Sequence, residues 1–197
     1  MLWIIHRLSQ LYPEKAILKG GMVLKFLNCP RYTNDLDYIF VPFRSKKEIL
    51  PLITKVFHEL KGAKWSHDMH STSLRIKISY QGFQTQIEAN VDKECKSEAL
   101  STNSLATDNN QAPHIIRVMS YDVMMSHKMA AWNERRLIRD LYDIYYIFTY
   151  LNVLPDVEIL KRRLTKIVYQ DKRLKEEAKK MSIADYLEKL QTQIAFL

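Results

Sequence analysis

Two aspartates separated by one residue, at the start of a short apolar segment, constrain the fold of this chain most. The segment reads Asp35-Leu36-Asp37-Tyr38-Ile39-Phe40-Val41 and is followed by Pro42. Residues two apart in an extended strand point to the same face. The sequence therefore predicts a strand at 35–41 with both carboxylates on one face and Leu36, Tyr38 and Phe40 facing the core. Like charges this close repel each other unless a cation lies between them or one is protonated. Mg²⁺ suits such a pair, because it prefers oxygen ligands and shares its coordination shell with substrate phosphates.

A glycine pair precedes the aspartates by about a dozen residues. Gly20 and Gly21 follow Lys19 and a short apolar segment, and a helical apolar pattern comes next. This order predicts a strand at 15–19, a tight turn and a helix at 21–28. Free backbone N–H groups and the positive dipole end at a helix start attract phosphate, and Lys19 adds a point charge. A glycine pair alone is ordinary turn punctuation. In this order, however, the two features are typical of a phosphate-binding turn followed by a metal-binding carboxylate pair.

Two motifs in this chain occur together in one known family. The first is Lys19-Gly20-Gly21 with Arg31-x-Thr33-x-Asp35-Leu36-Asp37. The second is Lys128-Met129-Ala130-Ala131-Trp132, then Arg136, then Arg139-Asp140-Leu141-Tyr142-Asp143-Ile144-Tyr145. With these motifs the chain resembles the AbiEii-type nucleotidyltransferases, a branch of the DNA polymerase beta-like superfamily with many toxins of type IV toxin–antitoxin systems. Position 22 is Met where the family usually has Thr, so one hydroxyl contact to a phosphate is missing.

The resemblance implies a fold, a reaction and a set of site residues. The fold is α/β (α+β): a nucleotidyltransferase domain with a small mixed sheet over 1–119 and a helical C-terminal part over 120–197 packed on it. The reaction moves a nucleoside monophosphate from an NTP to an acceptor hydroxyl, on tRNA, another RNA or a protein, and the partner is an antitoxin. The resemblance implies Mg²⁺ at Asp35 and Asp37. The nucleotide-binding residues are Lys19, Gly20, Gly21, Arg31 and Thr33.

A third acid commonly completes the metal site of polymerase beta-like enzymes, on a strand beside the Asp-x-Asp strand. Residues 72–80 and 83–91 alternate around Gln81-Gly82 and predict a hairpin. In its second strand Glu88 shares a face with Gln86 and Asn90, so it is a candidate metal ligand. Asp92 is the fallback. Alternatively, Glu88 is a solvent-facing residue on a half-buried sheet.

Lys128 and Asp143 have two interpretations. By resemblance, Lys128 steadies the triphosphate and Asp143 orients Lys128 or the acceptor. The alternative is a surface lysine, with i,i+4 ion pairs from Arg136 to Asp140 and from Arg139 to Asp143. Against this alternative, the helix face around Lys128 is otherwise apolar or small, which is an unusual place for a charge without a role.

Further elements follow from periodicity and turn residues. The sequence predicts helices at 1–12, 45–60, 121–135 and 137–151, a strand at 114–119, a long surface loop at 96–113 and a helical remainder.

Composition adds expectations about the surroundings of the protein. No apolar run approaches the ~20 residues that span a bilayer, and Cys29 and Cys95 lack metal-ligand spacing, so we expect free thiols in a reducing cytoplasm. The net charge is +8, with many basic residues after Lys128. Such a field attracts nucleic acid, although solvated helix faces also carry many cations. A rival interpretation is a catalytically inactive protein that keeps the fold and binds nucleotide or nucleic acid.

Overall fold

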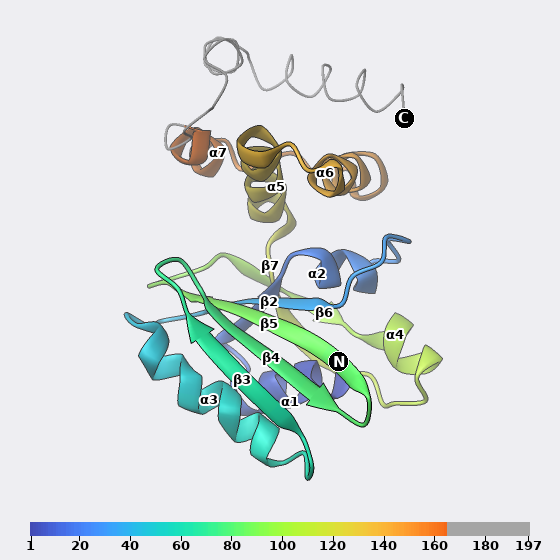
Figure 1. Cartoon of the computed structure of the whole chain (residues 1–197). Coiled ribbons are helices and arrows are strands. Elements are labelled where there is room, and N and C mark those ends of the chain that lie inside the picture. Colours follow the sequence, from blue (N-terminus) through green and yellow to red (C-terminus); the bar gives the residue numbers. More distant parts are fainter. Residues whose placement is uncertain (165–197) are drawn as a thin grey trace. The chain divides into compact units, whose positions relative to one another are not determined.

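The computed structural model describes residues 1–164 of the chain (Figure 1). These residues divide into two compact units. The first comprises Met1–Ser120, and the second begins at Tyr121. The first unit is built around a sheet, and the second is helical over its described part.

Seven strands of the first unit form one mixed sheet in the order β3-β4-β5-β2-β1-β7-β6. The pairs β2/β5 and β1/β7 are parallel, and the other neighbours are antiparallel. The predicted mixed α/β fold is therefore confirmed. The strands are β1 (Ala16–Lys19), β2 (Asp35–Phe40), β3 (Lys64–Met69), β4 (Leu74–Tyr80), β5 (Phe83–Val91), β6 (Ser97–Ser101) and β7 (Ile115–Met119).

Helices occur in both units. The first unit has α1 (Leu2–Leu11), α2 (Gly21–Phe26), α3 (Lys46–His58) and α4 (Asn103–Asp108), and the second has α5 (Tyr121–Arg135), α6 (Ile138–Leu151) and α7 (Val157–Leu164). Helix α3 begins with a capping box, in which the Ser45 side chain accepts a backbone N–H and the Glu48 carboxylate accepts the N–H of Ser45. Within residues 1–164, none of the helices has the length and apolar character needed to cross a membrane.

The sheet has an apolar face and a polar face. In β2, Leu36, Tyr38 and Phe40 are buried, whereas Asp35 is exposed and Asp37 is partly exposed. Neighbouring strands continue this pattern, and the apolar side chains of α3 pack against the same face. Each fully buried large apolar side chain contributes roughly 1.5–3 kcal/mol to folding. At β2 the core therefore lies on one side of the sheet and the two aspartates lie on the other, whereas β1 is buried on both faces.

Residues 96–113 were expected to form a surface loop, and this prediction was wrong. They contain β6 and α4. Strand β6 is polar in sequence because, within residues 1–164, it is an edge strand that pairs only with β7. Thr102 between the two elements is fully buried and bonds to His6 and His114. Strand β3 forms the opposite edge of the sheet and is also polar in sequence, and for this reason it was not predicted. As expected, Cys29 and Cys95 are not joined in a disulfide.

Candidate active site

The turn after β1 brings Lys19 and the glycine pair to Asp37. Lys19 is the register partner of Asp37 in the antiparallel β1/β2 pair. Gly20 has a φ of +76°, a conformation that residues with a side chain rarely adopt. A Cβ at Gly20 would also collide with the Asp37 carboxylate. Only glycine therefore allows the backbone to approach this carboxylate so closely.

Gly21 makes a similar close approach to the other polar residues of the first motif. A Cβ there would collide with the guanidinium of Arg31 and would lie 3.1 Å from Oγ1 of Thr33. The segment between α2 and β2 thus folds back over the beginning of α2. The structure brings Lys19, Gly20, Gly21, Arg31 and Thr33 together around the start of this helix.

The carboxylates of the first motif lie on the polar face of the sheet. Asp35 and Asp37 are two residues apart in β2, and their partners in the parallel strand β5 are Gln86 and Glu88. Within residues 1–164, no group of three or more His, Cys, Asp or Glu side chains is arranged to hold a metal ion. Two carboxylates on one face still fit Mg²⁺, which commonly takes one or two protein carboxylates and completes its shell with water and phosphates.

The two candidates for a third acid have other surroundings. Glu88 neighbours Asp37, but its Oε2 lies 3.5 Å from Nη2 of Arg75 on β4. Asp92 follows β5, four residues beyond Glu88, which is about 13 Å along a strand at about 3.3 Å per residue. Its Oδ1 accepts the backbone N–H of Lys93. Glu88 is therefore close to Asp37 but already paired, and Asp92 lies at the far end of the strand.

The second motif forms a buried charge cluster within the second unit. Nζ of Lys128, on α5, lies 2.5 Å from Oδ2 of Asp143 and 3.6 Å from Oδ1 of Asp140, both on α6. The two aspartate side chains are fully buried, and the Lys128 side chain is 15% exposed. Lys128 is therefore not the solvated surface lysine of the alternative interpretation, and Asp143 is positioned to orient it.

Asp140 is a cluster residue that sequence reasoning did not assign to the site. It receives two hydrogen bonds from Arg135, at 2.7 Å from Nε and 2.8 Å from Nη2. The i,i+4 argument favoured Arg136 as its partner. However, α5 ends at Arg135, and Arg136 has a φ of +53°, so Arg136 and Asp140 do not lie on one helix. The only sequence signal for the role of Asp140 was its place in the motif beside Asp143.

Part of the basic C-terminal sequence lies in α7. There Lys161 pairs with Glu158 at 3.2 Å and Arg163 pairs with Glu134 at 3.5 Å. Nε of Arg162 donates to the Glu158 carbonyl at 3.4 Å. These contacts favour a solvated helix face over a nucleic-acid surface for α7. The remaining basic residues of this region, from Lys166 onward, lie outside the described residues.

Comparisons with known proteins identify a family and a fold. A sequence model of the family described as nucleotidyl transferase AbiEii toxin, type IV TA system, matches residues 5–195. The crystal structure of JHP933 from Helicobacter pylori superposes with a TM-score of 0.54 at 14% identity, over 96% of this chain and 85% of that chain. A crystal structure named "putative nucleotidyltransferase" from H. pylori gives the same score and identity, over 96% of this chain and 88% of that chain. At this identity the two structures show the fold alone. None of the curated proteins matches the chain.

Proposed function

Because this chain belongs to the AbiEii family of nucleotidyltransferase toxins, we propose that it transfers a nucleoside monophosphate from an NTP to an acceptor hydroxyl in a Mg²⁺-dependent reaction. The observation that carries the proposal is the approach of the Asp37 carboxylate to Gly20, opposite Lys19. At this one turn, a carboxylate that can bind a metal lies next to a cation that can bind a phosphate. An antitoxin partner follows from the family.

In this proposal, the residues of the first motif bind the metal and the phosphates. Asp35 and Asp37 hold the metal. A bound Mg²⁺ would lower the pKa of the acceptor hydroxyl and neutralise triphosphate charge. Lys19, Arg31 and the backbone at Gly21 contact the phosphates, and Thr33 adds a hydroxyl close to Gly21.

Lys128 is proposed to bind the triphosphate as negative charge moves onto the departing pyrophosphate. Asp143 fixes the position of its ammonium group through the 2.5 Å contact. A cation held in advance loses little conformational entropy when its ligand arrives, which favours stabilisation of the transition state. NTPs and RNA are abundant in the cytoplasm, and we place the activity there.

The test is transfer from each labelled NTP with total RNA or with total protein as acceptor, together with a pyrophosphate assay. We expect label on one acceptor class, pyrophosphate release in equal amount, and loss of both when the metal is chelated. Asp37→Asn should abolish both signals. Asp68→Asn is the matched control, because Asp68 is an exposed carboxylate of β3 on the same row of the sheet. Mg²⁺-dependent NTP binding without pyrophosphate release would instead identify an inactive nucleotide-binding protein.

A further inference from the structure

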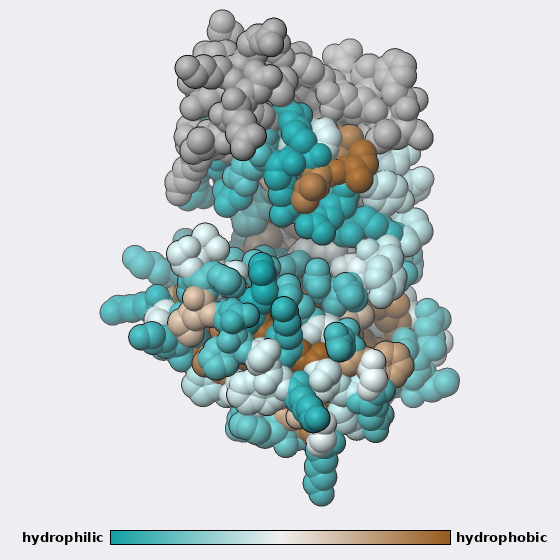
Figure 2. All heavy atoms as spheres, in the orientation of Figure 1, coloured by the Kyte–Doolittle hydropathy of each residue, from teal (hydrophilic) through white to brown (hydrophobic). Residues whose placement is uncertain are grey.

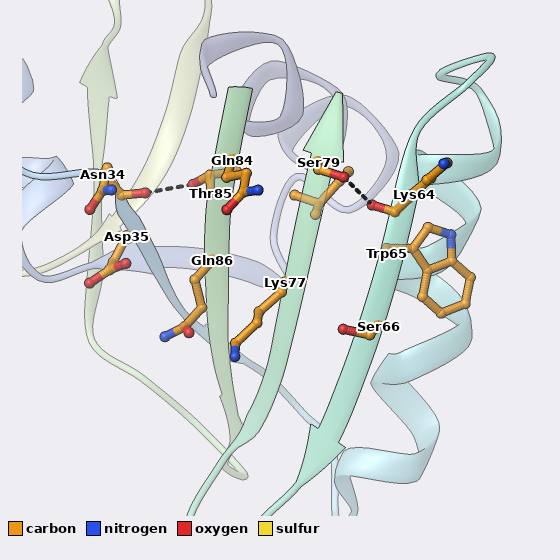
Figure 3. Close-up of a pocket in the computed structure, with 11 residues that line it drawn as sticks. Asn34, Asp35, Lys64, Trp65, Ser66, Lys77, Ser79, Gln84, Thr85 and Gln86 are labelled. Carbon is orange, nitrogen blue, oxygen red and sulfur yellow. Dashed lines mark hydrogen bonds between the residues drawn. The ribbon is translucent and has the colours of Figure 1, made fainter. Parts of the chain in front are cut away.

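A polar groove of about 560 Å³ lies over β3, β4 and β5 of the first unit and reaches Asp35 (Figure 3). Its lining includes Asn34, Asp35, Ser66, Lys77, Gln84 and Gln86. Most of these side chains carry amide, hydroxyl or charged groups, and the surface over this part of the first unit is mainly hydrophilic in Figure 2. This lining suits a polar ligand, unlike the apolar pockets that bind most small molecules.

One row of paired residues crosses the groove. Ser66 pairs with Lys77, Lys77 with Gln86, and Gln86 with Asp35, on four neighbouring strands. Paired residues on adjacent strands point to the same face, and Figure 3 shows the side chains of Asp35, Gln86 and Lys77 side by side. With strands about 4.8 Å apart, Lys77 is about 10 Å from Asp35 across the sheet. The row therefore contains the proposed metal ligand Asp35 and, two strands away, the cation Lys77.

The polar side chains of this row are available for a ligand in the part of the chain that the structure describes. In the described part of the chain, the Lys77 ammonium, the Gln86 amide and the Ser66 hydroxyl form no hydrogen bond or ion pair with another side chain. The neighbouring row on the same face, which contains Asp37, Glu88 and Arg75, differs because Arg75 is paired with Glu88. A cation without a partner among residues 1–164, beside an amide and a hydroxyl that can donate hydrogen bonds, forms a site for a phosphate group.

We propose that this row binds a backbone phosphate of a nucleic-acid acceptor, with Lys77 as the phosphate contact and Gln86 between it and Asp35. The proposal rests on the transferase function, because the acceptor's hydroxyl must reach Asp35. A nucleic acid carries a phosphate at a fixed distance from its terminal hydroxyl, which a protein acceptor does not. Contacts of this kind position a strand without reading its sequence. The groove thus favours a nucleic acid over a protein as acceptor.

The experiment measures binding of a fluorescein-labelled single-stranded oligoribonucleotide by anisotropy over a series of salt concentrations. Each phosphate neutralised on a single strand contributes about −0.7 to the slope of log K against log salt. Lys77→Gln should weaken binding and make the slope shallower by about 0.7, and Lys77→Arg should restore it. Lys47→Gln removes the same charge from an exposed position on α3 and should leave the slope unchanged.

Three results would overturn the proposal. An unchanged slope in Lys77→Gln removes Lys77 from any nucleic-acid site. A weaker affinity for NTP in this variant, with oligoribonucleotide binding intact, assigns the groove to the donor nucleotide. Labelling of proteins only, without oligoribonucleotide binding, excludes a nucleic-acid acceptor. The transferase function fails separately: a protein that releases no pyrophosphate but binds RNA through Lys77 lacks the reaction and keeps the site.

Discussion

The charge cluster of the second unit makes a prediction that separates its structural role from its catalytic role. Lys128→Met removes the ammonium 2.5 Å from Asp143 and leaves this fully buried carboxylate without its nearest cation. Removing one partner of a buried ion pair typically costs about 3–5 kcal/mol. In a chain of this size each kcal/mol lowers the melting temperature by about 2–4 °C, so we expect a decrease of about 6–20 °C.

The double variant Lys128→Met/Asp143→Leu distinguishes the two roles. Replacing both members of a buried pair by apolar residues of similar volume is often neutral or stabilising. The double variant should therefore be more stable than Lys128→Met alone, with Asp140 still held by Arg135. Nucleotide transfer should remain lost, because the variant lacks the Lys128 ammonium that we propose binds the triphosphate. Compared with Lys128→Met, the double variant should therefore regain stability but not activity.

Thermal melting and urea unfolding measure the stabilities, and pyrophosphate release measures activity. Lys161→Met is the control, because it removes one Lys from an exposed ion pair on α7 and should change the melting temperature little. Additive effects on the free energy of unfolding would show that Lys128 and Asp143 do not act as a pair. Transfer by the double variant at the native rate would remove both residues from the site.

Three further predictions concern the first unit. Asp35→Asn and Asp37→Asn should each abolish transfer while the melting temperature stays near the native value, because relieving a like-charge pair rarely destabilises a fold. Gly20→Ala should cost more than about 1–2 kcal/mol and also abolish transfer, because its Cβ adds a collision with the Asp37 carboxylate to the backbone strain, whereas Gly62→Ala, with a φ of +88° and no neighbour within 4 Å, should cost about 1–2 kcal/mol and stay active. Burial, and then His114, lowers the pKa of His6 to about 4. Its protonation therefore favours the unfolded state, and the free energy of unfolding should fall by at most about 1.4 kcal/mol per pH unit between about pH 6.5 and 4, a fall that is smaller in His6→Leu.

Elements whose sequence signal is local could be predicted closely. The alternation in β2 places Leu36, Tyr38 and Phe40 in the core and the two aspartates on the polar face. The glycine pair marks the turn between β1 and α2, because the backbone conformation of Gly20 is itself a local requirement. The same local signals identified the residues that converge at this turn.

Edge strands and contacts between elements could not be predicted in the same way. Among the described residues, strands β3 and β6 lie at the two edges of the sheet, so one side of each backbone has no partner strand and few of their side chains are buried. Their sequences therefore lack the apolar alternation on which strand prediction depends. The bonds from Arg135 to Asp140 cross the turn between two helices. A pairing rule for one continuous helix cannot find them.

The burial of the second motif supports our proposal that its cations bind phosphate, although the charge of the cluster is balanced. Its two carboxylates, Asp140 and Asp143, are fully buried, whereas the Lys128 side chain is 15% exposed and the Arg135 side chain 47% exposed. The formal charges cancel, but the groups that reach solvent are the cations, and the buried acids fix their positions. A phosphate that approaches this cluster therefore meets oriented N–H donors, with little reorganisation needed on binding. This arrangement also explains why Asp140→Asn should lower the affinity for NTP although Asp140 itself is inaccessible: the amide would hold Arg135 more weakly, and the loss should appear in the KM for NTP together with a lower melting temperature. An unchanged KM in a folded Asp140→Asn variant would limit this residue to stability.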